Sequence, residues 1–133
     1  MVAERLKKHT VSFKYAFKGL YYALRTQPNF AVHIFMAFAA AGLGLYLKIS
    51  DLEWAIIVLT ILAVLAAEMF NTALETVTDA LKVHKKTERD DYYIMVAKDV
   101  AAGAVLLSAV AAVIVGLIIF GPKIFSSTPG PIL

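Results

Sequence analysis

Acidic and amide side chains follow an uncharged apolar run in the middle of the chain. The run covers residues 54–67, and Glu68, Asn71, Thr72 and Glu75 come directly after it. On a helix that turns about 100° per residue, Glu68 and Glu75 lie within roughly 20° of each other and ~10 Å apart along the axis. Asn71 and Thr72 share their face. The spacing therefore predicts one row of oxygen-bearing groups where an apolar helix becomes polar.

The position of this row argues for a chemical role. A carboxylate near the centre of a bilayer costs a few kcal/mol, and such groups usually bind a cation, move a proton or pair with a base. The alternative is a solvated acidic stripe on a helix that leaves the membrane. That alternative suits Asp79, which has Lys82 close to it in sequence, but it does not suit Glu68, because fourteen uncharged residues precede Glu68. We therefore interpret Glu68 and Glu75 as functional.

The types of side chain indicate a hard cation and a phosphate. The chain contains no cysteine, and oxygen ligands suit Mg²⁺, which takes one or two carboxylates and completes its shell with waters and substrate phosphates. A phosphate would need a cationic partner, and Lys98, followed by Asp99, supplies one. The alternative is that Lys98 snorkels at a helix end. The sequence contains neither GxxxxGK[ST] nor GxGxxG, so a nucleotide site here must be built in another way.

The elements that carry these residues are apolar enough to span a bilayer. The 133 residues are 60% hydrophobic and 17% charged, with a mean hydropathy of +0.73. We predict one all-α membrane domain over residues 1–121 and a tail over 122–133. The predicted spans are 30–49, 52–82 with a cytoplasmic extension, and 92–121. Because about 20 apolar residues cross the hydrocarbon core, the second span must continue through Glu68 and Asn71.

Residues 11–26 predict an amphipathic helix before the first span. Its apolar positions follow helical spacing, and they are Phe13, Ala16, Phe17, Leu20, Tyr21 and Leu24. The basic residues on another face suit a helix that lies in the headgroup layer. The alternative is a helix packed on its own protein. Pro28 marks the entry to the next helix.

Basic residues predict the orientation in the membrane. Six lie before residue 28 and five between 82 and 98, whereas the opposite side has only Lys48 and Lys123. The positive-inside rule then places the N-terminus in the cytoplasm and the C-terminus outside. No cleavable signal peptide is evident, because residues 1–28 lack a long apolar core. Small residues recur at every fourth position of the third span, which favours close helix contacts and a homo-oligomer; they are Ala104, Ser108, Ala112 and Gly116.

Three segments resemble the prokaryotic diacylglycerol kinase family, the small three-span lipid kinases that include undecaprenol kinase of Gram-positive bacteria. The segment from Glu68 to Glu75 is similar to the family's E-x-x-N-[ST]-A-x-E signature. The segment that begins at Lys98 is similar to its K-D-x-[AG]-[AS]-[AG]-A-V segment, and Lys18-Gly19 is similar to a K-G pair in the amphipathic helix. The A-A-G form of the second segment and the stretch 29–33 look closer to the undecaprenol kinase branch. Order and spacing agree over about residues 11–121.

The resemblance implies a homotrimer with composite sites in the bacterial cytoplasmic membrane. It implies transfer of the γ-phosphoryl of MgATP to a lipid hydroxyl, with undecaprenol as the preferred acceptor and diacylglycerol as the second, and no nucleic-acid partner. It also implies residue roles: Glu68 as general base, Glu75 as metal ligand, Asn71 positioning phosphate or metal, Lys98 neutralising phosphate charge, and Asp99 and Lys18 contacting the nucleotide or its phosphates.

Two positions depart from the family pattern. Gln27 stands where a second metal-binding glutamate is usual, and its amide could offer a carbonyl oxygen but no charge; Ala31 stands where an arginine is common. Gln27 therefore favours one alternative, a degenerate non-catalytic homologue or small scaffold. A proton or cation conductor that uses Glu68 and Glu75 is a third class. Against conduction, both carboxylates lie toward one membrane face, so the outer half of every span lacks an ionisable relay.

Overall fold

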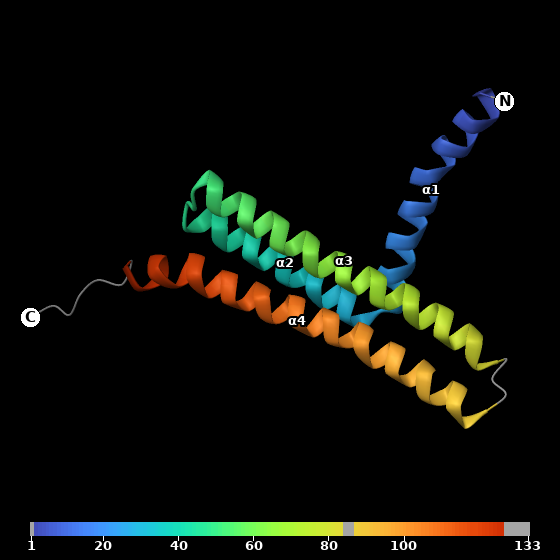
Figure 1. The fold of residues 1–133 in the computed structure, drawn as a ribbon. Coiled ribbons are helices and arrows are strands. Elements are labelled where there is room, and N and C mark those ends of the chain that lie inside the picture. The colour runs from blue at the N-terminus through green and yellow to red at the C-terminus, as the bar shows by residue number, and fades with distance from the viewer. Residues whose placement is uncertain (1, 84–86, 127–133) are drawn as a thin grey trace, which may run out of the picture.

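The computed structural model describes the backbone of residues 2–83 and 87–126 and the side chains of 13–83 and 87–125. The described residues form four helices (Figure 1), which are α1 (Val2–Thr26), α2 (Pro28–Tyr46), α3 (Asp51–Lys82) and α4 (Glu88–Ser126). By length and composition, α2, α3 and α4 are each able to cross a membrane. The predicted architecture of an N-terminal helix and three long apolar helices is therefore confirmed.

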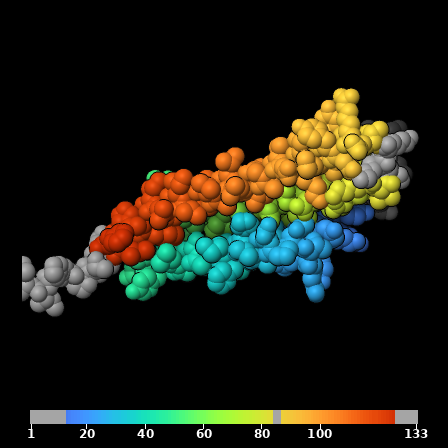
Figure 2. Space-filling model, turned by 90° about the horizontal axis from the view of Figure 1, so that it is seen from below, coloured from blue at the N-terminus to red at the C-terminus, as the bar shows by residue number. Residues whose placement is uncertain are grey.

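Helices α3 and α4 run alongside each other for most of their length, and α2 packs beside them (Figure 1). Seen from below, α2 and α4 flank α3, which is visible between them (Figure 2). Helix α1 leaves the bundle steeply where α2 begins, and its fully buried Ala23 lies near that junction. Many large apolar side chains on the outer faces of the long helices stay exposed, such as Phe38, Leu59 and Leu107. Such apolar faces are stable against the hydrocarbon chains of lipids, whereas their exposure to water is unfavourable.

A capped turn joins α2 to α3 at the end of the bundle that lies away from α1 (Figure 1). The Ser50 backbone N–H donates to Glu53 Oε2 at 2.7 Å, and the Glu53 backbone N–H donates to Ser50 Oγ at 3.4 Å, which forms a capping box. Lys48 has a φ of 51°, so α2 ends at Tyr46, before the predicted boundary at residue 49. Lys123 Nζ contacts Glu53 Oε2 at 3.2 Å and ties the end of α4 to this turn.

Helices α1 and α4 are longer than predicted. Helix α4 starts at Glu88 instead of 92, because Thr87 Oγ1 accepts from the Asp90 backbone N–H at 3.2 Å and Asp90 Oδ2 accepts from the Thr87 N–H at 3.0 Å. It continues past Pro122 to Ser126, so residues 122–126 are helix and not tail. The rest of the predicted tail, 127–133, lies outside the described residues. Helix α1 starts at Val2 instead of residue 11.

Candidate functional site

The predicted row of polar groups lies on one face of α3, and much of it is buried. Glu68 is only 2% exposed, and Asn71 and Thr72 are buried as well. The Thr72 hydroxyl donates to the Glu68 backbone carbonyl at 2.8 Å. A threonine that bonds back to its own helix needs no outside partner. Among the charged residues of α3, Glu68 is the most deeply buried, and it lies where the apolar run ends.

Glu68 has two electrostatic neighbours, Glu75 on the same helix and His33 on α2. His33 is half-buried. From the sequence alone His33 has no predicted role, because it is a single ionisable side chain near the start of an otherwise apolar stretch. Packing of α2 against α3 brings it to the candidate base, and no pattern within residues 30–47 carries that information.

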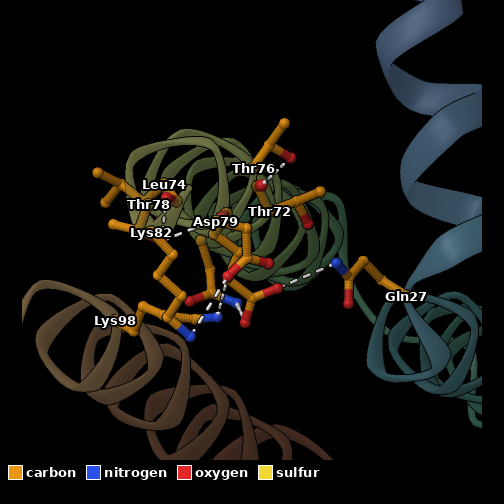
Figure 3. Close-up of polar contacts among 10 residues, drawn as sticks. Gln27, Thr72, Leu74, Thr76, Thr78, Asp79, Lys82 and Lys98 are labelled. Atoms are coloured by element: carbon orange, nitrogen blue, oxygen red, sulfur yellow. Dashed lines mark hydrogen bonds and ion pairs between the residues drawn. The ribbon is translucent and has the colours of Figure 1, made fainter. Parts of the chain in front are cut away.

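Two side-chain amides hold the Glu75 carboxylate. Gln27 Nε2 donates to Glu75 Oε2 at 3.1 Å, and Asn71 Nδ2 donates to Glu75 Oε1 at 3.2 Å. Asn71 lies one turn before Glu75, whereas Gln27 is the residue between α1 and α2. Figure 3 shows the Gln27 side chain reaching from that junction to α3. The structure thus brings together three predicted site residues: Gln27, Asn71 and Glu75.

The residues around Glu75 fit a divalent cation with a mixed shell. Within residues 13–83 and 87–125, the buried Asn71 Oδ1 has no hydrogen-bond partner, and a buried orphan acceptor is the kind of atom that an ion or water satisfies. No cluster of three or more His, Cys, Asp or Glu side chains able to hold a metal occurs among the described residues. The protein therefore offers the Glu75 carboxylate and the Asn71 amide oxygen, which suits Mg²⁺ because waters and phosphates complete its coordination.

Lys98 of α4 reaches the same face of α3 one turn further along. Its Nζ donates to Asp79 Oδ1 at 2.9 Å, and Lys82 Nζ lies 3.6 Å from the same oxygen. Lys98 also interacts electrostatically with Glu75. Gln27 and Lys98 approach α3 from opposite sides (Figure 3). The sequence predicts a solvated Asp79, and Asp79 is exposed, but it also positions the candidate phosphate-binding lysine.

Two predicted site residues do not join this group within the chain. Lys18 is exposed, and its Nζ lies 5.9 Å from the centre of the Tyr15 ring on its own helix. Asp99 is exposed on α4. Both residues lie on surfaces that are open in the single chain.

A shallow, open groove of about 420 Å³ separates α1 from α3 beside the buried row. It is lined by Gly19, Tyr22, Met69, Thr72, Ala73 and Thr76. A Cβ atom at Gly19 would lie 3.6 Å from Met69 Cε, an ordinary contact distance. The groove thus runs between the surface helix and the helix that carries Glu68.

Comparisons with known proteins agree with the motifs. The family model of prokaryotic diacylglycerol kinase matches residues 14–120. A diacylglycerol kinase of Synechocystis sp. is 42% identical over 118 residues, which cover 87% of this chain and 64% of that protein. The undecaprenol kinase of Bacillus subtilis is 37% identical over 119 residues, which cover 90% of this chain and 93% of that protein.

The chain thus spans less than two thirds of the Synechocystis relative and nearly all of the Bacillus one. No solved structure matches. The family match covers all of α2 and α3 and every candidate site residue from Lys18 to Asp99. The chain therefore belongs to the prokaryotic diacylglycerol kinase family.

Proposed function

We propose that this protein is an ATP- and Mg²⁺-dependent lipid kinase that transfers the γ-phosphoryl group of ATP to the hydroxyl of undecaprenol. Membership of the family supports a lipid kinase, and the names of the two relatives give two acceptors, diacylglycerol and undecaprenol. Diacylglycerol is the second candidate acceptor. A degenerate, non-catalytic homologue is the outcome that Gln27 would favour.

One observation carries the proposal: a buried carboxyl group lies at the end of an apolar span, next to a cluster that suits metal and phosphate. Glu68 is 2% exposed, and the amide-bound Glu75 and the Asp79-bound Lys98 follow on the same face of α3. A lipid hydroxyl reaches such a depth from the bilayer, whereas a nucleotide arrives from water. The arrangement therefore suits a reaction between a membrane alcohol and a soluble phosphate donor.

The proposed roles follow from what each group is able to do. Glu68 would accept the proton of the lipid hydroxyl as the hydroxyl oxygen attacks the γ-phosphorus; the bond from that phosphorus to the bridging oxygen would break, and ADP would leave. Glu75 would hold Mg²⁺, with Asn71 offering its unpartnered amide oxygen. When bound, Mg²⁺ neutralises phosphate charge and orients the transferring group. Phosphoryl transfer depends mainly on such positioning and charge stabilisation.

The cationic and nucleotide-binding roles belong to residues toward the cytoplasmic side. Lys98 would leave Asp79 to neutralise the phosphates, and the exposed Asp79 carboxylate would keep Lys82 as a partner. Asp99 and Lys18 would contact the nucleotide. Because both are exposed in the single chain, a homotrimer with composite sites, in which another copy completes the nucleotide site, accommodates them.

The groove between α1 and α3 supports undecaprenol as the acceptor. Its Thr72 and Thr76 hydroxyls donate to the backbone carbonyls of Glu68 and Thr72, both at 2.8 Å. The protons of these two hydroxyls are therefore used within the helix, and the other lining residues are apolar apart from the single hydroxyl of Tyr22. A diacylglycerol would bring two ester carbonyls that need donors. A polyprenol is hydrocarbon apart from its hydroxyl group, so it suits this groove better.

The proposed setting is the bacterial cytoplasmic membrane, with the N-terminus and the α3–α4 connection in the cytoplasm. Eleven basic residues against two support this orientation. It places Lys98 and Glu75 on the side where ATP is present.

The deciding experiment is ATP-dependent phosphorylation by the purified protein in detergent. Undecaprenol and diacylglycerol are supplied separately, each with Mg²⁺ and with excess chelator. We expect Mg²⁺-dependent product with both lipids and a higher kcat/KM for undecaprenol. A higher kcat/KM for diacylglycerol would reverse the order of acceptors. No product with either lipid from a folded oligomer would contradict the kinase proposal.

A further inference from the structure

The junction between α1 and α2 presents a donor to the candidate metal ligand. The group of Gln27 that faces Glu75 is the amide nitrogen, and Nε2 lies 3.1 Å from Oε2. An amide N–H₂ group carries only donors, so it repels a cation, whereas the amide carbonyl oxygen is the atom that would bind one. In this geometry Gln27 binds Glu75, the candidate metal ligand, and not the metal ion itself.

The backbone of Gln27 is fixed on both sides, which makes its side chain a stiff support. Gln27 has φ −112° and ψ 105°, the extended conformation that a following proline favours. Its N–H donates to Ala23 O at 2.9 Å, and its carbonyl accepts from the Phe30 N–H at 3.1 Å. Ala23 and Phe30 are both buried. The side chain therefore starts from a position that both helices hold.

Glu75 keeps its ability to bind a cation while two amides hold it. A carboxylate has about four lone-pair sites, and the bonds from Gln27 and Asn71 use one on each oxygen. Both donors are neutral, so the negative charge stays available. A lysine or arginine at position 27 would instead neutralise it, and a carboxylate would repel it until a cation arrived.

We propose that Gln27 is a positioning residue that holds the Glu75 carboxylate through its N–H group from the α1–α2 junction and does not itself bind the cation. This inference rests on the part of the proposed function that gives Glu75 a divalent cation. It replaces the family-based role of this position as a second metal ligand with the role of a hydrogen-bond donor to Glu75.

The first measurement uses the fact that Gln27 is the only glutamine in the sequence. Labelling with side-chain ¹⁵N-glutamine gives one ¹⁵N resonance with two proton signals, whose exchange with solvent is followed by NMR on the full-length protein in detergent. We expect slow exchange both without and with saturating Mg²⁺, and faster exchange in Glu75→Ala. Fast exchange in the wild type, or protection that disappears on adding Mg²⁺, would overturn the proposal, the latter because the carbonyl would have turned toward the ion.

The second measurement is Mn²⁺ affinity, read from the EPR signal of free Mn²⁺. Gln27→Leu keeps the approximate size of the side chain but removes its donor, so the Kd for Mn²⁺ should rise about three- to tenfold, the loss expected for one hydrogen bond that orients a ligand. Asn29→Leu is the matched control, an exposed amide at the same junction, and should change the Kd less than about twofold. Equal affinities of Gln27→Leu and the wild type would overturn the proposal.

Neither readout depends on phosphoryl transfer. A protein that protects Gln27 and binds Mn²⁺ but phosphorylates neither lipid would contradict the kinase proposal and leave this inference standing. An active kinase in which the Gln27 N–H₂ group exchanges fast with solvent would support the kinase proposal and contradict this inference.

Discussion

Lys98 of α4 and Asp79 of α3 form an ion pair between the two longest helices beside the candidate site, with Nζ 2.9 Å from Oδ1. The pair is partly exposed, so it contributes little to stability. Its effect is positional: it holds a lysine with a long, flexible side chain next to Glu75, with which that lysine also interacts electrostatically.

The first prediction concerns this lysine. Lys98→Met should lower kcat/KM for ATP on the order of 10²-fold, because a fixed positive charge would be lost where phosphate charge develops. Lys82→Met is the matched control, since Lys82 contacts the same Asp79 oxygen at 3.6 Å, and it should lower kcat/KM less than about threefold. Steady-state kinetics of both variants checks this; equal losses would refute a special role for Lys98.

The second prediction concerns the buried carboxylate. Glu68→Gln is nearly isosteric but cannot accept the hydroxyl proton, so turnover should fall by roughly 10²- to 10⁴-fold. The oligomer should remain assembled by size-exclusion chromatography. Glu88→Gln changes an exposed carboxylate in the first turn of α4 and should leave the rate unchanged. Turnover retained by Glu68→Gln would exclude it as the base.

The third prediction concerns the metal. Glu75→Gln removes the negative charge that the two amides hold, so the Mg²⁺ concentration for half-maximal activity should rise about tenfold or more. Asp79→Asn, one turn along the same face, is the control and should shift that concentration much less. A Mg²⁺ titration of both variants tests the assignment, and an unchanged midpoint in Glu75→Gln would count against it.

The fourth prediction concerns packing at the opposite end of the bundle. A Cβ on Gly44 would lie 3.0 Å from Ile49 Cδ1 and from two atoms of the Trp54 ring, whereas one on Gly42 meets nothing within 4 Å. Gly44→Ala should therefore destabilise the protein by about 1 kcal/mol through overpacking. Gly42→Ala should stabilise it by about 0.5 kcal/mol, because alanine suits a helix better. Thermal unfolding in detergent compares them; equal shifts would contradict this account.

Local periodicity was enough to predict the helices and the row on α3. The three apolar stretches indicated spans because a bilayer demands about 20 such residues. Glu68 and Glu75 share a face because seven residues make nearly two turns, and Asn71 bonds Glu75 as an i, i+4 neighbour. The capping box at Ser50 and Glu53 is also readable from the sequence as S-x-x-E. The helix ends were less accurate because caps such as Thr87 with Asp90 set them.

The contacts that complete the site were decided by tertiary structure. Gln27 is 48 residues from Glu75, and Lys98 is 19 residues from Asp79. The proximity of His33 to Glu68 likewise comes from the packing of α2 on α3. The sequence alone determined a three-span membrane protein with carboxylates in line at the end of its second span. Which groups meet those carboxylates depends on the crossing angles and the axial register of separate helices, which side-chain packing fixes and which helical periodicity leaves undetermined.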